Sequence, residues 1–330
     1  NVYVGGHEPG VGRPDPSLVL YADRRFDPAG FDLSGRTISV VGTLLSTTGV
    51  GLLSTHGIAA AGPSLIKADR IDLDAPQGTI TARIDSAVSG TGGLAARALG
   101  DITIVEIACD LSFLNPTVWT GAAAFVLSQD DIELRTVGGS ILDGVSNDAA
   151  ETVHVQGDDV KLFAFGSGTA ITVKAVTGGA FSGRATTLNL NFEADAVVET
   201  LMAERTITVN GAGSLTLKRG GKIETQSEGA TIRLTAGGFI HFEADTRVSA
   251  GVVYDSVSEQ PSVSGAAADL VLEAGNEIFL NGEIAVSGNV SLKSGTSVSD
   301  FATYFDTLPG TFLFNRMANA AIHAGLDAET

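Results

Sequence analysis

Two pairs of adjacent acidic residues are the strongest candidates for chemistry in this sequence: Asp130-Asp131 and Asp158-Asp159. Glycoside hydrolysis uses two carboxyl groups, one that protonates the leaving oxygen and one that acts as a nucleophile or base. Such an enzyme requires the four aspartates to converge in one groove. The structural alternative is that each pair opens a strand at a corner, where aspartate side chains accept hydrogen bonds from turn amides. The sequence favours this structural interpretation, and we expect no catalytic residue.

The sequence contains no recognisable motif for a metal or cofactor. The 20 Lys and Arg residues are scattered, so a calcium-assisted lyase with a basic catalyst is not indicated. Both the glycine-rich calcium nonapeptide and the EF-hand loop are missing from the sequence. The acidity attracts calcium weakly, but no motif supports a calcium site. We therefore expect no cofactor and no metal ligand.

The histidines and the cysteine are expected to be structural. No two histidines are close enough for a His-x-x-x-His metal pair, so each is expected at the surface or in a turn. The single cysteine, Cys109, lies in the run 106–111, which predicts a packed strand with a buried thiol. The five histidines are His7, His56, His154, His241 and His323.

Short alternating segments of β-branched residues and leucine position all of these residues. Gly, Asn, Asp and Ser separate the segments, which therefore predict a long succession of strands. Each segment holds about four residues, fewer than the five or six of a typical sandwich strand. Representative segments are 37–40, 70–73, 101–104, 131–134, 159–162, 170–173 and 187–190.

A three-strand unit repeats in the second half of the chain. Its first copy contains the apolar pairs Ile207/Val209, Leu215/Leu217 and Ile223/Thr225. The pairs recur 25 residues later as Ile232/Leu234, Ile240/Phe242 and Val248/Ala250. They recur again 38 residues further on as Leu270/Leu272, Ile278/Leu280 and Val286, and a loop over 251–265 absorbs the surplus. Segments 236–238 and 274–276 are expected to form the same turn of successive repeats.

This three-strand repeat predicts an all-β fold, a right-handed parallel β-helix with three short strands per coil. A single coil cannot bury its inward residues, whereas stacked coils bury a continuous core. Strand twist makes the parallel connections right-handed. Immunoglobulin-like sandwiches are the rival all-β fold, but they need six to eight strands before the pattern closes and often contain a buried Trp. The chain has only one Trp.

The two ends of the chain do not follow the three-strand repeat. We expect one domain, with an irregular N-terminal segment or cap over 1–31 and the parallel β-helix over 32–300. A C-terminal cap, or the start of a further irregular coil, is expected over 301–330, with a helix over 312–324. Caps are expected because an open β-helix end exposes unpaired backbone groups.

The charge of the chain excludes several partners. The formal net charge of -18 repels the phosphate backbone of nucleic acids and anionic membrane surfaces. No stretch approaches eighteen uninterrupted apolar residues, so membrane insertion is not expected. The N-terminus Asn1-Val2-Tyr3 lacks an initiator Met and a signal segment, which suggests a processed piece of a longer protein.

Segments 100–111 (GDITIVEIACDL) and 138–144 (GGSILDG) resemble repeats of giant bacterial exoproteins related to filamentous haemagglutinin, and 234–238 (LTAGG) is similar. By cadence the resemblance covers 32–300. It implies successive coils of a secreted β-helical fibre that displays adhesive surfaces, exported by a two-partner or type I route. A second, weaker resemblance links Thr55-His56-Gly57 to the His-Gly element of polygalacturonase-like glycosidases. The other elements of that enzyme family, Asn-Thr-Asp and Arg-Ile-Lys, are missing from the sequence.

We therefore expect a non-enzymatic structural or adhesive segment of a large secreted or cell-surface bacterial protein. Its expected partners are a host or neighbouring cell, matrix, a glycan or further copies of itself. Tyr254 in 251–265 and Trp119 in 115–119 are the expected binding residues, because aromatic side chains in loops stack on sugars. The alternatives are a polysaccharide-degrading β-helix enzyme, such as a glycoside hydrolase or a tailspike-like depolymerase, and a self-assembling extracellular filament.

Overall fold

The structure is a computed structural model. It describes residues 3–5, 18–22, 31–46, 49–86, 92–115, 124–142, 153–227, 229–254, 261–263, 268–295, 297–300, 305–308, 311–314 and 321–324. All regular elements in these ranges are β-strands. Within them, no helix of the length and hydropathy needed to cross a membrane is present.

The chain divides into two compact units, residues 1–175 and 176–330. The first unit contains β1 (Tyr3–Gly5), β2 (Leu18–Ala22), β3 (Phe31–Leu45), β4 (Gly49–Ala60), β5 (Leu65–Lys67), β6 (Arg70–Ala75), β7 (Thr79–Asp85), β8 (Gly93–Ala98), β9 (Ile102–Glu106), β10 (Leu111–Ser112), β11 (Ala124–Leu127), β12 (Ile132–Thr136), β13 (Ile141–Leu142), β14 (Val153–Gly157), β15 (Val160–Ala164) and the start of β16 (Ala170–Thr177). The second unit contains β17 (Ala180–Phe192), β18 (Ala196–Gly211), β19 (Leu215–Thr225), β20 (Thr231–Ala236), β21 (Ile240–Ala250), β22 (Val252–Tyr254), β23 (Pro261–Val263), β24 (Asp269–Ala274), β25 (Glu277–Val286), β26 (Val290–Ser294), β27 (Ser297–Asp300), β28 (Phe305–Leu308), β29 (Thr311–Phe314) and β30 (Ala321–Ala324).

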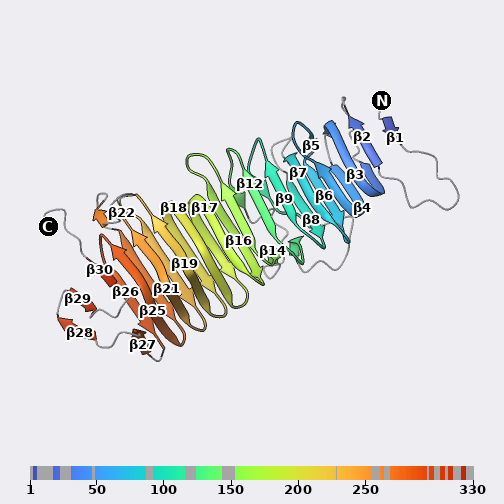
Figure 1. The fold of residues 1–330 in the computed structure, drawn as a ribbon. Coiled ribbons are helices and arrows are strands. Elements are labelled where there is room, and N and C mark those ends of the chain that lie inside the picture. The colour runs from blue at the N-terminus through green and yellow to red at the C-terminus, as the bar shows by residue number, and fades with distance from the viewer. Residues whose placement is uncertain are drawn as a thin grey trace. The chain divides into compact units, whose positions relative to one another are not determined.

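Strands of the first unit stack in three parallel columns, one for each side of a coil. The first column contains β6, β8, β11 and β14. The second contains β7, β9, β12 and β15, and the third contains β10, β13 and β16. Figure 1 shows the neighbouring strands of the second column side by side. This arrangement confirms the predicted parallel β-helix.

The core of the first unit is a ladder of aliphatic side chains that runs through successive coils. Ile58, Ile80, Ile102, Ile132 and Val160 are register partners from coil to coil, and none is more than 2% exposed. Since side chains alternate along a strand, the residues between the inward positions face outward. Complete burial of each aliphatic side chain stabilises the fold by roughly 1.5–3 kcal/mol.

Strand pairing in the second unit confirms the 25-residue repeat. Ile207 pairs with Ile232, and Leu215 pairs with Ile240. The next coil follows the 38-residue offset for its first two strands, because Ile232 pairs with Leu270 and Ile240 with Ile278.

The third strand of that coil corrects the predicted offset. Val248 pairs with Ile284, so Val286 lies opposite Ala250. The cause is a shorter turn: Thr246 pairs with Gly282, and two residues of the earlier turn have no counterpart in the later coil. Gly282 is suited to this close approach, because a Cβ there would lie 2.0 Å from the Thr246 hydroxyl.

The predicted common turn of segments 236–238 and 274–276 is also confirmed. The Gly275 N–H donates to the Ala236 carbonyl at 2.8 Å, and the Asn276 N–H donates to the Gly238 carbonyl at 3.0 Å. A Cβ on Gly275 would lie 2.1 Å from the carbonyl oxygen of Gly237. The turn therefore needs glycine because the backbones of successive coils are in contact.

Parallel pairing also reaches both terminal segments. β2 pairs with β3, and β30 pairs with β25. The expected helix over 312–324 is wrong, since β29 pairs antiparallel with β28 and β30 joins the parallel stack. A sheet edge presents unpaired backbone groups, and strand pairing there overrides a weak helical pattern. Within 251–265, β22 and β23 form an antiparallel pair, so this interval carries strands as well as loop.

Candidate functional site

The four candidate aspartates lie together at one corner of two successive coils in the first unit. The Asp158 N–H donates to the Asp130 carbonyl at 2.9 Å. The Asp159 N–H donates to Asp131 Oδ1 at 3.2 Å, so the Asp131 side chain caps a turn amide as the structural interpretation predicts. Asp130 and Asp158 are exposed, whereas Asp131 and Asp159 are half-buried. Stacking therefore brings the four aspartates to one corner of the first unit.

Of the two aromatic residues expected to bind a ligand, the structure describes only the backbone of Tyr254. Trp119 lies outside the described residues. The backbone of Tyr254 ends β22 and pairs with Pro261 of β23, and its side chain lies outside the described residues.

His154 corrects the expectation of surface histidines, since it is only 4% exposed. Its ring stacks on Phe113 and on Phe125, with a centroid separation of 5.7 Å in each case. Its Nδ1 accepts a hydrogen bond from the backbone N–H of Lys174 at 3.0 Å. Alternation alone also would not place His154 inside, because β14 buries two consecutive residues, His154 and Val155.

The remaining histidines have different positions. His56 is exposed, as expected, and His241 is half-buried. The side chains of His7 and His323 lie outside the described residues.

Aromatic rings on the outer side of the second unit form the aromatic cluster, defined as Phe239, His241 and Phe279. The Phe279 centroid lies 5.8 Å from each of the other two rings, and Phe239 is 41% exposed. Register pairing of His241 with Phe279 places them on neighbouring coils. The exposed ring of Phe239 offers an apolar surface on which the C–H face of a sugar can pack.

A second group of side chains, the acid–thiol cluster, consists of Asp85, Glu106 and Cys109. Glu106 is the last residue of β9, and its side chain is completely buried. Its register partners on the neighbouring coils are Ile84 and Thr136. Asp85 ends β7, is almost completely buried and forms an ion pair with Lys67.

Cys109 differs from its predicted environment. β9 ends at Glu106 and β10 begins at Leu111, so the run 106–111 is not one packed strand. Cys109 lies in the bend between these strands and is half-buried.

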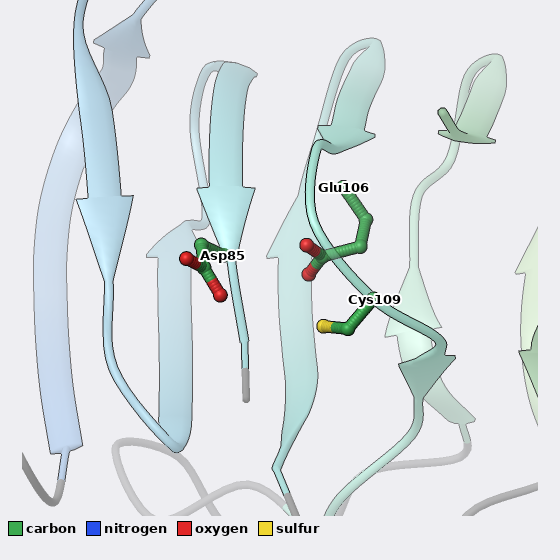
Figure 2. A group of neighbouring side chains, drawn as sticks. All are labelled: Asp85, Glu106 and Cys109. Carbon is green, nitrogen blue, oxygen red and sulfur yellow. The ribbon is translucent and has the colours of Figure 1, made fainter. Parts of the chain in front are cut away.

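Stacking of coils brings these three side chains together. One ligand atom from each of Asp85, Glu106 and Cys109 lies within 4.8 Å of the others. Figure 2 shows the Glu106 carboxylate and the Cys109 thiol directed toward the Asp85 side. Glu106 Oε2 accepts a hydrogen bond from the Ser86 N–H at 2.9 Å, and Oε1 accepts one from the Ala108 N–H at 3.0 Å. The carboxylate therefore caps two turn amides while it faces the thiol.

Burial dominates the electrostatics of this cluster. It raises the pKa of the Glu106 carboxyl, against the opposing effect of hydrogen bonds from Ala108 and Ser86. Burial and the negative charge of Glu106 raise the pKa of the Cys109 thiol to about 12. Without a bound cation, Cys109 is therefore a protonated thiol at neutral pH and a poor nucleophile.

Sequence reasoning missed the acid–thiol cluster, although one signal was present. In β9, Ile102 and Ile104 are buried and Glu106 continues the same parity, so an acidic residue occupies a position that otherwise takes apolar side chains. The contribution of Asp85 had no local signal, because it depends on the stacking of β7 against β9.

Comparison of the chain with known proteins found no matching protein-family model, no matching curated protein and no matching solved structure. The assignment of the fold therefore rests on the observed strand pairing. The strands of each unit form a parallel β-helix.

Proposed function

We propose that this chain is a non-enzymatic structural or adhesive segment of a large secreted bacterial surface protein, related to filamentous haemagglutinin. It displays loops and sheet faces that bind cells, matrix or glycans. The observation that supports this proposal is the aromatic cluster of Phe239, His241 and Phe279. The exposed ring of Phe239 packs against the half-buried ring of Phe279 on the neighbouring coil, and an apolar surface of this kind on a solvated sheet face favours ligand contact.

The use of Asp131 as a turn cap also supports a non-enzymatic role. Its carboxylate accepts the Asp159 N–H, so it already performs a structural task at the corner. Two stacked coils that repeat the same acidic dipeptide need capped turns whether or not a substrate is present.

A glycan array that scores retained glycan and released reducing ends in the same wells tests the proposal. We expect retention without product. Replacement of both Phe239 and Phe279 by alanine should weaken retention roughly 10-fold, since each aromatic contact contributes about 0.5–1.5 kcal/mol. Leu53→Ala is the matched control, because Leu53 is similarly exposed at 40% but lies outside the cluster. Equal loss of retention in both variants contradicts the assignment of the aromatic cluster.

Alanine variants of Tyr254 and Trp119 test the two binding residues expected from the sequence. Each should reduce retention if its loop contacts the ligand. Unchanged retention in both variants would remove these residues from the proposed binding surface.

The polysaccharide-degrading enzyme remains the second candidate, favoured by the convergence of Asp130 and Asp158 at one corner. The spacing of neighbouring strands, about 4.8 Å, is close to the carboxylate separation of about 5–5.5 Å in retaining glycosidases. Product that disappears in both Asp130→Asn and Asp158→Asn would replace the adhesive proposal with hydrolysis.

A further inference from the structure

The acid–thiol cluster has the donor types of a site for a divalent cation that accepts thiolate. Asp85 and Glu106 offer carboxylate oxygens and Cys109 offers sulfur, all within 4.8 Å of one another. Zinc binds sulfur at about 2.3 Å and carboxylate oxygen at about 2.0–2.2 Å, which keeps tetrahedral donors roughly 3.5 Å apart. The donor atoms therefore need to close by only about 1 Å. Cys109 lies in a bend, where such an adjustment leaves the strand ladders intact.

Ser86 supplies an independent observation. Its side chain is completely buried, and within the part of the chain that the structure describes its hydroxyl has no hydrogen-bond partner of acceptable geometry. The hydroxyl points into the cluster, where weak hydrogen bonding to the Glu106 carboxylate and the Cys109 thiol lowers the pKa of both groups, although neither contact has the geometry of a full hydrogen bond. Buried hydroxyl groups nearly always have a partner. A cation-bound water in the cluster would provide the missing one.

The surrounding charges suit a divalent cation. Two carboxylates and a thiolate carry three negative charges, which a divalent cation and the ammonium group of Lys67 balance. Lys67 contacts one oxygen of Asp85, and the second oxygen of a carboxylate can bind a metal at the same time. Lys67 thus has the position of a residue that orients a metal ligand.

We propose that Asp85, Glu106 and Cys109 bind a thiophilic divalent cation, for which zinc and cadmium are suitable probes. The sulfur ligand disfavours calcium and magnesium, which take oxygen ligands. The cation joins β7 to the bend after β9, so it links two successive coils of the first unit. Because a cation that binds only the folded chain stabilises it, loading raises the unfolding temperature of this unit.

Titration of the purified, reduced chain with cadmium tests the proposal, because a cadmium–thiolate bond has its own ultraviolet charge-transfer absorption. We expect one ion per chain with this absorption, competition by zinc and an increased unfolding temperature. Cys109→Ala should abolish the absorption. Cys109→Ala and Asp85→Asn should each weaken cadmium binding by at least about 100-fold, because loss of a residue that only supports a ligand already weakens metal binding by up to about 100-fold. The control is the double replacement of Asp130 and Asp158 by asparagine, which removes two exposed carboxylates of the same unit and should change neither signal.

Three results overturn the proposal. The first is a wild-type chain without thiolate absorption on addition of cadmium. The second is unchanged cadmium affinity in Cys109→Ala, which assigns binding to surface carboxylates. The third is unchanged affinity in a folded Asp85→Asn variant. Circular dichroism establishes folding of each variant, and if Asp85→Asn does not fold, Cys109→Ala alone decides, because its half-buried bend tolerates a smaller side chain.

Discussion

Substitution of His154 separates two contributions that the structure assigns to one ring. His154→Phe keeps an aromatic ring between Phe113 and Phe125 but removes the acceptor of the Lys174 N–H. Leaving that amide unsatisfied costs about 1–3 kcal/mol. His154→Asn keeps an acceptor near the position of Nδ1 but removes two ring contacts, each worth about 0.5–1.5 kcal/mol, and so costs about 1–3 kcal/mol.

His154→Ala removes both contributions and leaves a cavity, so the expected cost rises to about 3–5 kcal/mol. Urea unfolding followed by circular dichroism measures the three free energies of unfolding. Hydrogen exchange of the β16 amides locates the change near Lys174. The reasoning is refuted if His154→Ala is no less stable than the Phe and Asn variants, because the ring then supplies neither the hydrogen bond nor the stacking.

Three further predictions concern stability. Burial raises the pKa of Glu106 above its ordinary 4.5, so the folded chain binds this proton more tightly than the unfolded chain. The stability that protonated Glu106 contributes is therefore full below pH 4.5 and is lost as the pH rises through the raised pKa. In Glu106→Gln, which does not titrate, this decrease in stability should be smaller. Urea midpoints measured between about pH 4 and 8, with a chelator present, test the prediction. Gly275→Ala places a Cβ 2.1 Å from a carbonyl oxygen of the preceding coil and should cost more than about 2 kcal/mol, whereas Gly138→Ala, with no atom within 4 Å of its Cβ, should cost less than about 0.5 kcal/mol. Equal thermal stability of these two variants would show that the coils do not approach as closely as described. Ile132→Ala in the core ladder should lower the free energy of unfolding by about 2–5 kcal/mol. Val137→Ala should lower it by less than about 0.5 kcal/mol, because Val137 is 58% exposed. Comparable urea midpoints for the two variants would contradict the inward assignment of Ile132.

Local patterns predicted the parts of the fold that depend on local interactions. Alternation at Ile207 and Val209 identified a strand, and its recurrence at Ile232 and Leu234 identified the next coil. The turn at Gly275 was predictable for the same reason, since glycine is the residue that tolerates close backbone contact.

Local patterns failed where competition from distant strands decided the outcome. Segment 312–324 has a weak helical pattern, but β29 and β30 pair with other strands instead. His154 was expected at the surface or in a turn. An interior slot between Phe113 and Phe125 buries it, and no local pattern describes that slot.

By itself, the sequence determined the parallel β-helix, because the inward–outward alternation and the glycine turns are properties of each short segment. Only the tertiary structure decided which side chains meet. Asp85 and Glu106 are 21 residues apart, and their contact depends on the register of β7 against β9. That register depends on the lengths of all the turns in one coil. The later coil shows this, because its shorter turn makes Val248 pair with Ile284, two residues before the position that the 38-residue offset predicts. A change of two residues in one turn alters which residues pair in the strand that follows it. The acid–thiol cluster and the aspartate corner therefore form only once the coils are stacked.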